Sequence, residues 1–153
     1  MKSFRILSIL ISPILLSGCF SLTPPKQKEE KEEPTKQEIN HTYDEIKDLK
    51  IYWNDIFKQP FNSYYVYLYS ETCSHCNSIK NEMIEFALDA IEKIYFISSS
   101  AEHVLRETID PFQRIESLDD LAIRGYPTLL KLEEKVVIKN IAGVKDIKRE
   151  LSL

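Results

Sequence analysis

The chain has 153 residues, enough for one domain with appendages, and 43% of them are hydrophobic against 29% charged. The formal net charge is −4 and no block of basic residues occurs, so the composition argues against a nucleic-acid binder. Three cysteines are too few for a small domain held together by several disulfides.

Residues 1–18 predict a targeting segment that lies outside the folded domain. Lys2 and Arg5 precede an apolar run over 6–16 that is too short for an ordinary membrane span. The run ends in Leu16-Ser17-Gly18-Cys19, which resembles the lipobox of bacterial lipoproteins. We therefore expect a lipoprotein signal peptide and a lipidated Cys19. An ordinary signal peptide followed by a chance cysteine is the alternative.

The mature chain is predicted to consist of a lipid anchor, a tether and a folded domain. Acyl chains on Cys19 would hold it on the extracytoplasmic face of a bacterial cell membrane, because each buried methylene contributes about 0.8 kcal/mol. Residues 19–41 are rich in Lys, Glu, Gln and Pro, which predicts a disordered charged tether, although a charge-recognising role is an alternative. Without Lys2 and Arg5, the 20 basic residues become 18 against 24 acidic ones, a formal charge of −6. The globular domain is expected over 42–153.

Hydrophobic spacing predicts the first elements of this domain. Residues 43–57 carry apolar side chains near helical spacing, which predicts a helix that Pro60 ends. The aromatic and β-branched run over 64–69 predicts a buried strand, and the first of two closely spaced cysteines follows soon after it. A second helix is then predicted from an apolar stripe made of Ile79, Met83, Ile84, Phe86, Ala87 and Ile91.

The second half of the domain is predicted to add three strands and further helices. The strands are expected at 94–97, 128–132 and 136–141, the last two forming a hairpin. Residues 101–123 are mainly polar, and Pro111 divides them into two candidate helices. A short helix is expected at 146–151. A βαβ unit joined to a hairpin in this order predicts an α/β fold class.

Cys73 and Cys76 are predicted to stand at the beginning of the second helix. The first backbone N–H groups of a helix are unpaired and its macrodipole is positive there, so both favour a thiolate at Cys73. His75 adds a candidate positive charge beside it. Cys76, one turn later, could attack a mixed disulfide and resolve it.

A CxxC motif alone also allows a metal site or a haem attachment point. Zinc needs two further ligands at suitable spacing, and the remaining histidines, His41 and His103, do not supply a recognisable set. Haem attachment requires a histidine directly after the second cysteine, where Asn77 stands. The redox interpretation is therefore favoured over both.

Fifty residues further on, Gly125-Tyr126-Pro127-Thr128 precedes the predicted hairpin, and Gly143 follows it. Together with Cys73-Ser74-His75-Cys76, this pattern resembles the thioredoxin superfamily over about residues 64–151. The resemblance implies a thioredoxin-like fold, with a central mixed β-sheet flanked by helices, and no cofactor or metal. It also implies that Pro127 is cis, although an ordinary trans proline turn is the alternative.

The resemblance assigns roles to both motifs. Cys73 would be the attacking thiol and Cys76 the resolving thiol. The loop 125–128 would bind substrate, with Tyr126 offering backbone hydrogen bonds to an extended peptide. Ser74 and His75 would tune the thiolate, since His before the second cysteine is found in disulfide isomerases and periplasmic oxidases. We therefore expect a reduction potential of roughly −120 to −230 mV.

The pattern also departs from thioredoxin in two places. Many thioredoxins have a buried acid six residues before the first cysteine, and here that position is Tyr67, which puts fast deprotonation of Cys76 in doubt. The segment 98–124 is longer than the corresponding link of thioredoxin and carries many charges. Its charges are interpreted as a solvated helical face, with a partner-selecting insertion as the alternative.

The leading hypothesis is a lipid-anchored, extracytoplasmic thiol–disulfide oxidoreductase. It would act as a monomer on exported Cys-containing proteins or on a membrane redox partner, without nucleic acid. The direction of electron flow, reductase or oxidase and isomerase, stays open. One alternative is a non-redox binding or accessory lipoprotein of an export system with an inert cysteine pair. A weaker one is metal capture by Cys73, His75 and Cys76.

Overall fold

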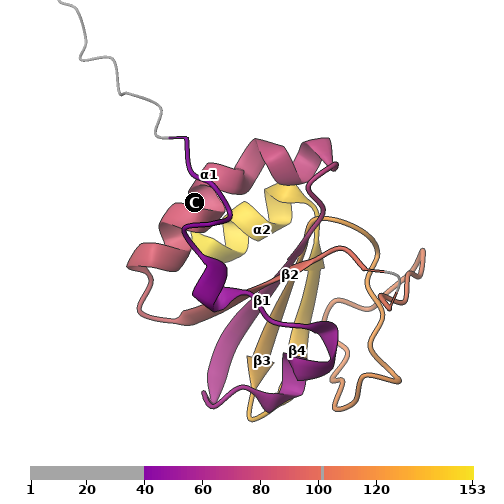
Figure 1. Cartoon of the computed structure of the whole chain (residues 1–153). Coiled ribbons are helices and arrows are strands. Elements are labelled where there is room, and N and C mark those ends of the chain that lie inside the picture. The colour runs from indigo at the N-terminus through magenta and orange to yellow at the C-terminus, as the bar shows by residue number, and fades with distance from the viewer. Residues whose placement is uncertain (1–39, 101) are drawn as a thin grey trace, which may run out of the picture. The chain divides into compact units, whose positions relative to one another are not determined.

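The computed structural model describes residues 40–100 and 102–153 (Figure 1). The predictions for the signal peptide, Cys19 and nearly all of the tether lie outside these residues. The helices and strands in chain order are η1 (Lys47–Leu49), η2 (Trp53–Lys58), β1 (Ser63–Tyr69), α1 (Ser74–Asp89), β2 (Lys93–Ser98), β3 (Thr128–Glu133), β4 (Val136–Ala142) and α2 (Val144–Leu151), where η marks a 3-10 helix. Among the described helices, none is both long and apolar enough for a membrane span.

The four strands form one mixed sheet in the order β2-β1-β3-β4. β1 runs parallel to β2, with Tyr67 opposite Phe96, and antiparallel to β3, with Tyr67 opposite Leu129. β3 and β4 form an antiparallel hairpin with a bulge near Lys131. The predicted α/β class and all four predicted strands are confirmed.

β1 occupies the middle of the sheet because nearly every side chain on both of its faces is apolar or aromatic. Tyr65, Tyr67 and Tyr69 pack on the face covered by α1 and α2. Tyr64, Val66 and Leu68 pack on the opposite face, which η2 and the segment 102–126 cover. Figure 1 shows the two α-helices together on one side of the sheet. Period-two alternation therefore gives the domain a core on each side of the sheet.

The predicted helix over 43–57 is wrong. Two short 3-10 helices, η1 and η2, occupy this range, separated by an extended stretch around Lys50. There Lys50 makes a parallel bridge to Phe96, and the Ile51 N–H donates to the Phe96 carbonyl at 2.9 Å. Hydrogen bonding to the edge of β2 thus replaces the intrahelical bonds that the apolar spacing alone would predict.

The helices expected within 101–123 are also absent from the described residues of that range. Instead, the segment pairs with the sheet and with itself. Ile115 forms an antiparallel bridge to Val137 of β4, and Leu105 forms a parallel bridge to Ile123. The Asn140 N–H donates to the Pro111 carbonyl at 2.8 Å, so the segment covers the outer edge of β4. Its buried apolar residues are Ile115 and the consecutive run Leu121-Ala122-Ile123, a pattern without helical periodicity.

The helix after the cysteines is confirmed, with one correction to its apolar stripe. Ile79, Met83 and Ile84 are buried, and Phe86 and Ala87 pack partly against them. Ile91, by contrast, is fully exposed and lies beyond the end of α1 at Asp89.

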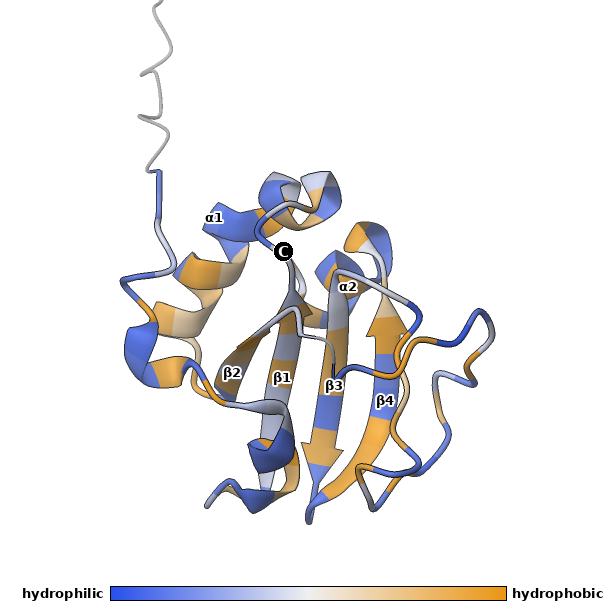
Figure 2. Ribbon diagram, turned by 45° about the vertical axis from the view of Figure 1, so that its right-hand side comes forward, coloured by the Kyte–Doolittle hydropathy of each residue, from blue (hydrophilic) through white to orange (hydrophobic). Residues whose placement is uncertain are grey.

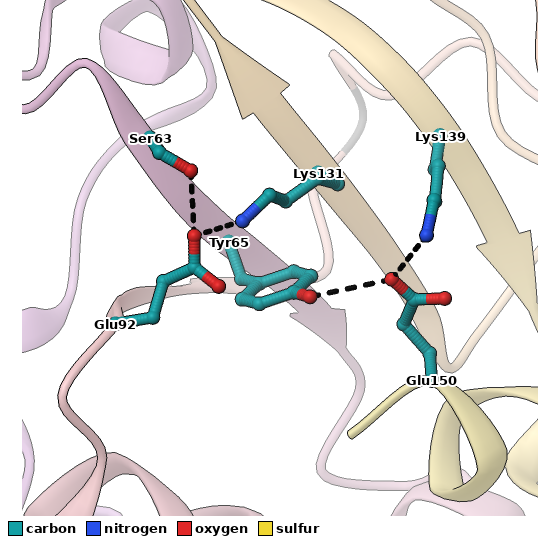
Figure 3. A network of polar contacts seen from close by, with 6 residues as sticks. All are labelled: Ser63, Tyr65, Glu92, Lys131, Lys139 and Glu150. Atoms are coloured by element: carbon teal, nitrogen blue, oxygen red, sulfur yellow. Dashed lines mark hydrogen bonds and ion pairs between the residues drawn. The ribbon is translucent and has the colours of Figure 1, made fainter. Parts of the chain in front are cut away.

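Hydrophilic bands interrupt the hydrophobic colour of β3 and β4 in Figure 2, and the lysines of these strands belong to a polar network. Glu92 accepts hydrogen bonds from Lys131 and, at 2.5 Å, from Ser63. The Lys131 ammonium also lies 4.2 Å from the centre of the Tyr65 ring. The Tyr65 hydroxyl donates to Glu150 at 3.3 Å, and Lys139 pairs with the same carboxylate at 2.7 Å (Figure 3). Through Glu150 the network ties α2 to the sheet, and through Glu92 it ties the residue before β2 to β1 and β3.

This network predicts a contribution to stability that is lost in acid. Burial alone would raise the pKa of Glu92, but the hydrogen bonds from Lys131 and Ser63 outweigh it and hold that pKa below its ordinary value. The stabilisation is therefore present above the unfolded-state pKa of about 4.3 and disappears as the pH falls through the lower folded-state value. Because the Glu92 side chain is 36% exposed, this stabilisation is expected to stay below about 1 kcal/mol.

The measurement is urea unfolding of the wild type and Glu92→Gln at pH values between about 3 and 7. The variant is expected to lose less stability than the wild type as the pH falls. Parallel curves for the two proteins would show that Glu92 contributes no pH-dependent stability.

Candidate functional site

The chain places Cys73 at the N-cap of α1, directly after the loop that leaves β1. The Cys76 N–H donates to the Cys73 Sγ at 3.3 Å, which is the bond that a serine or aspartate N-cap side chain ordinarily accepts. A sulfur in this position faces the unpaired N–H groups and the positive end of the helix. Cys73 is partly exposed, and both cysteines are free thiols.

Cys76 differs from Cys73 because it is completely buried one helical turn further on. Burial raises the pKa of the Cys76 thiol to about 12. At neutral pH Cys76 is therefore protonated, while Cys73 has both the exposure and the hydrogen bonding of a nucleophile. The pair has the asymmetry that attack by one thiol and resolution by the other require.

This asymmetry predicts selective alkylation. Iodoacetamide at pH 8 is expected to modify Cys73 at least about 100-fold faster than Cys76, because only a thiolate reacts and the Cys76 thiol is both protonated and inaccessible. Peptide mass spectrometry after a time course in the native state measures both rates. Comparable rates at the two positions would contradict the asymmetry, and equal rates in denaturant serve as the control.

The structure brings the Gly125–Thr128 loop against Cys73, although 53 residues separate Cys73 from Tyr126. The Cys73 Sγ lies 3.5 Å from the Tyr126 carbonyl oxygen. The Tyr126–Pro127 peptide bond is cis, and Gly125 has a φ of 147°, which side-chain-bearing residues rarely adopt. The Thr128 hydroxyl donates to the Gly125 carbonyl at 2.7 Å, and the Gly143 N–H donates to the Pro127 carbonyl at 3.0 Å. These bonds fix the loop beside the thiol.

Ser74 and His75 lie in the first turn of α1, and both side chains are exposed. The His75 imidazole makes no hydrogen bond or ion pair within 40–100 and 102–153. The backbone carbonyl of His75 accepts a hydrogen bond from Ser78 Oγ at 2.8 Å. Any influence of His75 on the thiolate would thus act through charge at the helix terminus rather than through a direct contact.

Tyr67 occupies the position six residues before the first cysteine. It is fully buried in the same core cluster as Cys76, and its hydroxyl has no hydrogen-bond partner among the described residues. Burial raises the pKa of Tyr67, so this hydroxyl stays neutral and cannot accept the Cys76 proton as a carboxylate would. Tyr69 belongs to the same cluster, and the partly buried Tyr43 packs against it with the two ring centroids 4.0 Å apart.

His103, which its residue type makes a candidate metal ligand, also lies in this region. It is 8% exposed, its Nδ1 is within hydrogen-bond distance of the Tyr126 hydroxyl, and its ring lies 4.6 Å from that of Trp53. A single histidine in a polar segment gives no periodic signal, so only the folded path of the chain brings it to Tyr126. Within the described residues, no group of three His, Cys, Asp or Glu side chains is placed to hold a metal ion.

A mixed sheet in the order β2-β1-β3-β4, a CxxC at the N-terminus of α1 and a cis proline beside its first cysteine define a thioredoxin-like fold. No protein-family model and no curated protein matches the chain. Among solved structures it is similar to Chlamydomonas reinhardtii thioredoxin f2, with 14% identity and a TM-score of 0.48 over 68% of this chain and 90% of that one. It is also similar to spinach chloroplast thioredoxin f in its short form, with 17% identity and a TM-score of 0.46 over 66% and 86%.

Proposed function

We propose that the protein is a thiol–disulfide oxidoreductase that uses Cys73 and Cys76. The observation that carries this proposal is the asymmetric thiol pair: one sulfur is exposed and capped by a helix N-terminus, and the other is buried 3 residues away. In the reducing direction, the Cys73 thiolate attacks a client disulfide, forms a mixed disulfide and displaces one client thiolate, which takes up a proton. Cys76 then gives up its proton and attacks Cys73, which releases the second client thiolate and leaves a Cys73–Cys76 disulfide.

The same steps run backwards would deliver a disulfide to a client, and two electrons then pass from client to protein. Exposure of His75 at the helix terminus supports the oxidising or isomerising direction, because a positive charge there stabilises the reduced thiolate form. No cofactor is needed in either direction, since the electrons move between sulfur atoms.

The client would bind as an extended segment beside the cis-proline loop. The Tyr126 N–H has no acceptor among the described residues, and its carbonyl is held only by the weak Cys73 S–H donor. An extended peptide could pair with both groups as an added strand. A shallow hollow of about 280 Å³ adjoins this loop; it is lined by Arg124, Gly125, Tyr126, Pro127, Ala142 and Gly143.

We further propose that the protein works as a monomer on the extracytoplasmic face of a bacterial cell membrane. The lipobox at residues 16–19 supports removal of residues 1–18 and acylation of Cys19. Residues 19–41 would then act as the tether and 42–153 as the redox domain. Exported cysteine-containing proteins or a membrane redox partner are the clients that such a location supplies.

The proposed function is tested with the full mature chain, purified in detergent, and a short peptide containing one disulfide. The protein is expected to accelerate exchange between this peptide and glutathione catalytically. In cells, Cys19→Ser is expected to move the protein from the membrane fraction to the soluble fraction without changing exchange by the purified chain. Stoichiometric rather than catalytic exchange would contradict the enzymatic proposal.

A second candidate is a non-redox binding module of an export system, and the buried tyrosine at position 67 favours it. The buried Tyr67 hydroxyl stays neutral and cannot take the Cys76 proton, so turnover through the cysteine pair would be slow. This candidate predicts peptide binding beside Pro127 that Cys73→Ser and Cys76→Ser both leave unchanged, as isothermal titration with the reduced peptide would show.

A further inference from the structure

The segment 102–126 contributes a buried histidine to the candidate site. His103 is 8% exposed, although it lies in a loop of mainly polar and charged residues. Trp53 of η2 packs against its ring at a centroid distance of 4.6 Å and an interplanar angle of 37°. Burial lowers the pKa of His103, so the imidazole is neutral at pH 7 and can hydrogen-bond without bringing a charge into the core.

One nitrogen of this imidazole is directed at the residue that contacts Cys73. His103 Nδ1 and the Tyr126 hydroxyl form a short hydrogen bond, and the two rings lie 5.7 Å apart. His103 Nε2 is buried and has no partner among the described residues, so the Tyr126 bond is the polar contact that orients the ring. A chain of contacts therefore runs from Trp53 through His103 and Tyr126 to Cys73.

The last contact of this chain bears on the chemistry of the thiol. The Tyr126 carbonyl lies 3.5 Å from the Cys73 Sγ, where it accepts the S–H and partly covers the sulfur. A carbonyl at this position stabilises the thiol form of Cys73, whereas the Cys76 N–H stabilises the thiolate. A displacement of Tyr126 would change both the hydrogen bonding of the Cys73 sulfur and the access of a client to it.

We propose that His103 is a positioning residue: it holds the Tyr126 side chain and through it keeps the Tyr126 carbonyl on Cys73. This inference rests on the proposed function for its biological meaning, but its physical content is a coupling between His103 and the reactivity of Cys73. The long segment between β2 and β3 would then serve to bring His103 to the cis-proline loop.

The test measures alkylation of Cys73 by iodoacetamide in the full mature chain, over a range from about pH 5 to about pH 10. His103→Phe keeps an aromatic ring against Trp53 but removes both nitrogens. Tyr126→Phe removes only the hydroxyl. Each is expected to raise the alkylation rate at pH 7 about two- to threefold and to move the pH profile downward, with the limiting rate at high pH unchanged.

Two further variants separate positioning from a loss of packing. The double variant His103→Phe/Tyr126→Phe is expected to show the same two- to threefold change as either single variant. Each single variant already removes the one hydrogen bond that joins His103 to Tyr126, so the second change has no further bond to remove. His103→Asn, which can offer a polar atom near the position of Nδ1, is expected to restore the wild-type profile in part. Tyr52→Phe is the matched control: Tyr52 is 79% exposed and lines the same cavity as His103, so its loss of a hydroxyl should change nothing.

The outcomes distinguish this proposal from the proposed function. Unchanged alkylation in both His103→Phe and Tyr126→Phe, or effects that multiply in the double variant, would overturn the positioning role. Peptide disulfide exchange by the wild type is measured in parallel. If the wild type exchanges no disulfide while the variants still shift the alkylation profile, the oxidoreductase proposal fails and the coupling stands. Should His103→Phe fail to fold, Tyr126→Phe and the control still decide the question.

Discussion

Cys73→Ser is expected to reduce peptide disulfide exchange to the uncatalysed rate, a loss of about three orders of magnitude or more. Cys73 is the partly exposed sulfur at the N-cap of α1, and it lies 3.5 Å from the Tyr126 carbonyl. A serine hydroxyl in the same place stays protonated at neutral pH and cannot attack a disulfide. Cys76 cannot take over the role of Cys73, because Cys76 is buried and its burial raises the pKa of its thiol to about 12.

Cys76→Ser is the informative counterpart, since it should leave attack intact and block resolution. The variant is expected to accumulate a mixed disulfide between Cys73 and the peptide, which non-reducing mass spectrometry detects. Ser78→Ala, a change on the exposed side of the same helix, serves as the control for effects on folding. If Cys73→Ser kept a substantial part of the exchange activity, the roles assigned to the two cysteines would be wrong.

Phe96→Ala is expected to lower the free energy of unfolding by about 3–5 kcal/mol. Phe96 stands in β2 opposite Tyr67 and is fully buried, with its ring edge-on to Tyr67 at 5.6 Å and to Tyr69 at 6.4 Å. The truncation removes these aromatic contacts and leaves a cavity that the sheet cannot close. Its backbone carbonyl still accepts the Ile51 N–H, so the connection to η1 is kept.

Urea unfolding followed by tyrosine and tryptophan fluorescence measures this loss. The matched control is Phe112→Ala, because Phe112 is 70% exposed on the segment that covers β4. The control is expected to change stability by less than about 0.5 kcal/mol. Similar losses for the two variants would contradict the placement of Phe96 in the core beneath α1.

The strands and the cysteine-bearing helix could be predicted from sequence because their signals are local. The run around Tyr67 is uncharged and aromatic, as a strand buried on both faces must be, and Ile79, Met83 and Ile84 repeat at helical spacing. The hairpin was predicted in the same way, although its turn is shorter than expected. Glu134 and Lys135 take positive φ values of 50° and 63°, which a two-residue turn requires but these residue types do not signal.

The elements that could not be predicted depend on contacts between distant parts of the chain. The bridge from Lys50 to Phe96 breaks the apparent helix over 43–57, and the bonds from Pro111 and Ile115 to β4 hold the segment 102–126 in a non-helical path. The same holds within the site. The CxxC and the Gly125–Thr128 loop carry motifs that could be found, whereas His103 becomes significant only once the folded chain places it against Tyr126.

The most direct test of the oxidoreductase account is the equilibrium reduction potential of the Cys73–Cys76 pair. The full mature chain is titrated against glutathione buffers, and the oxidised fraction is read by alkylation and mass spectrometry. We expect a reversible two-electron equilibrium with a potential between roughly −120 and −230 mV, above the value of about −270 mV for thioredoxin. A pair that forms no mixed disulfide and stays in one redox state across all buffers would contradict it.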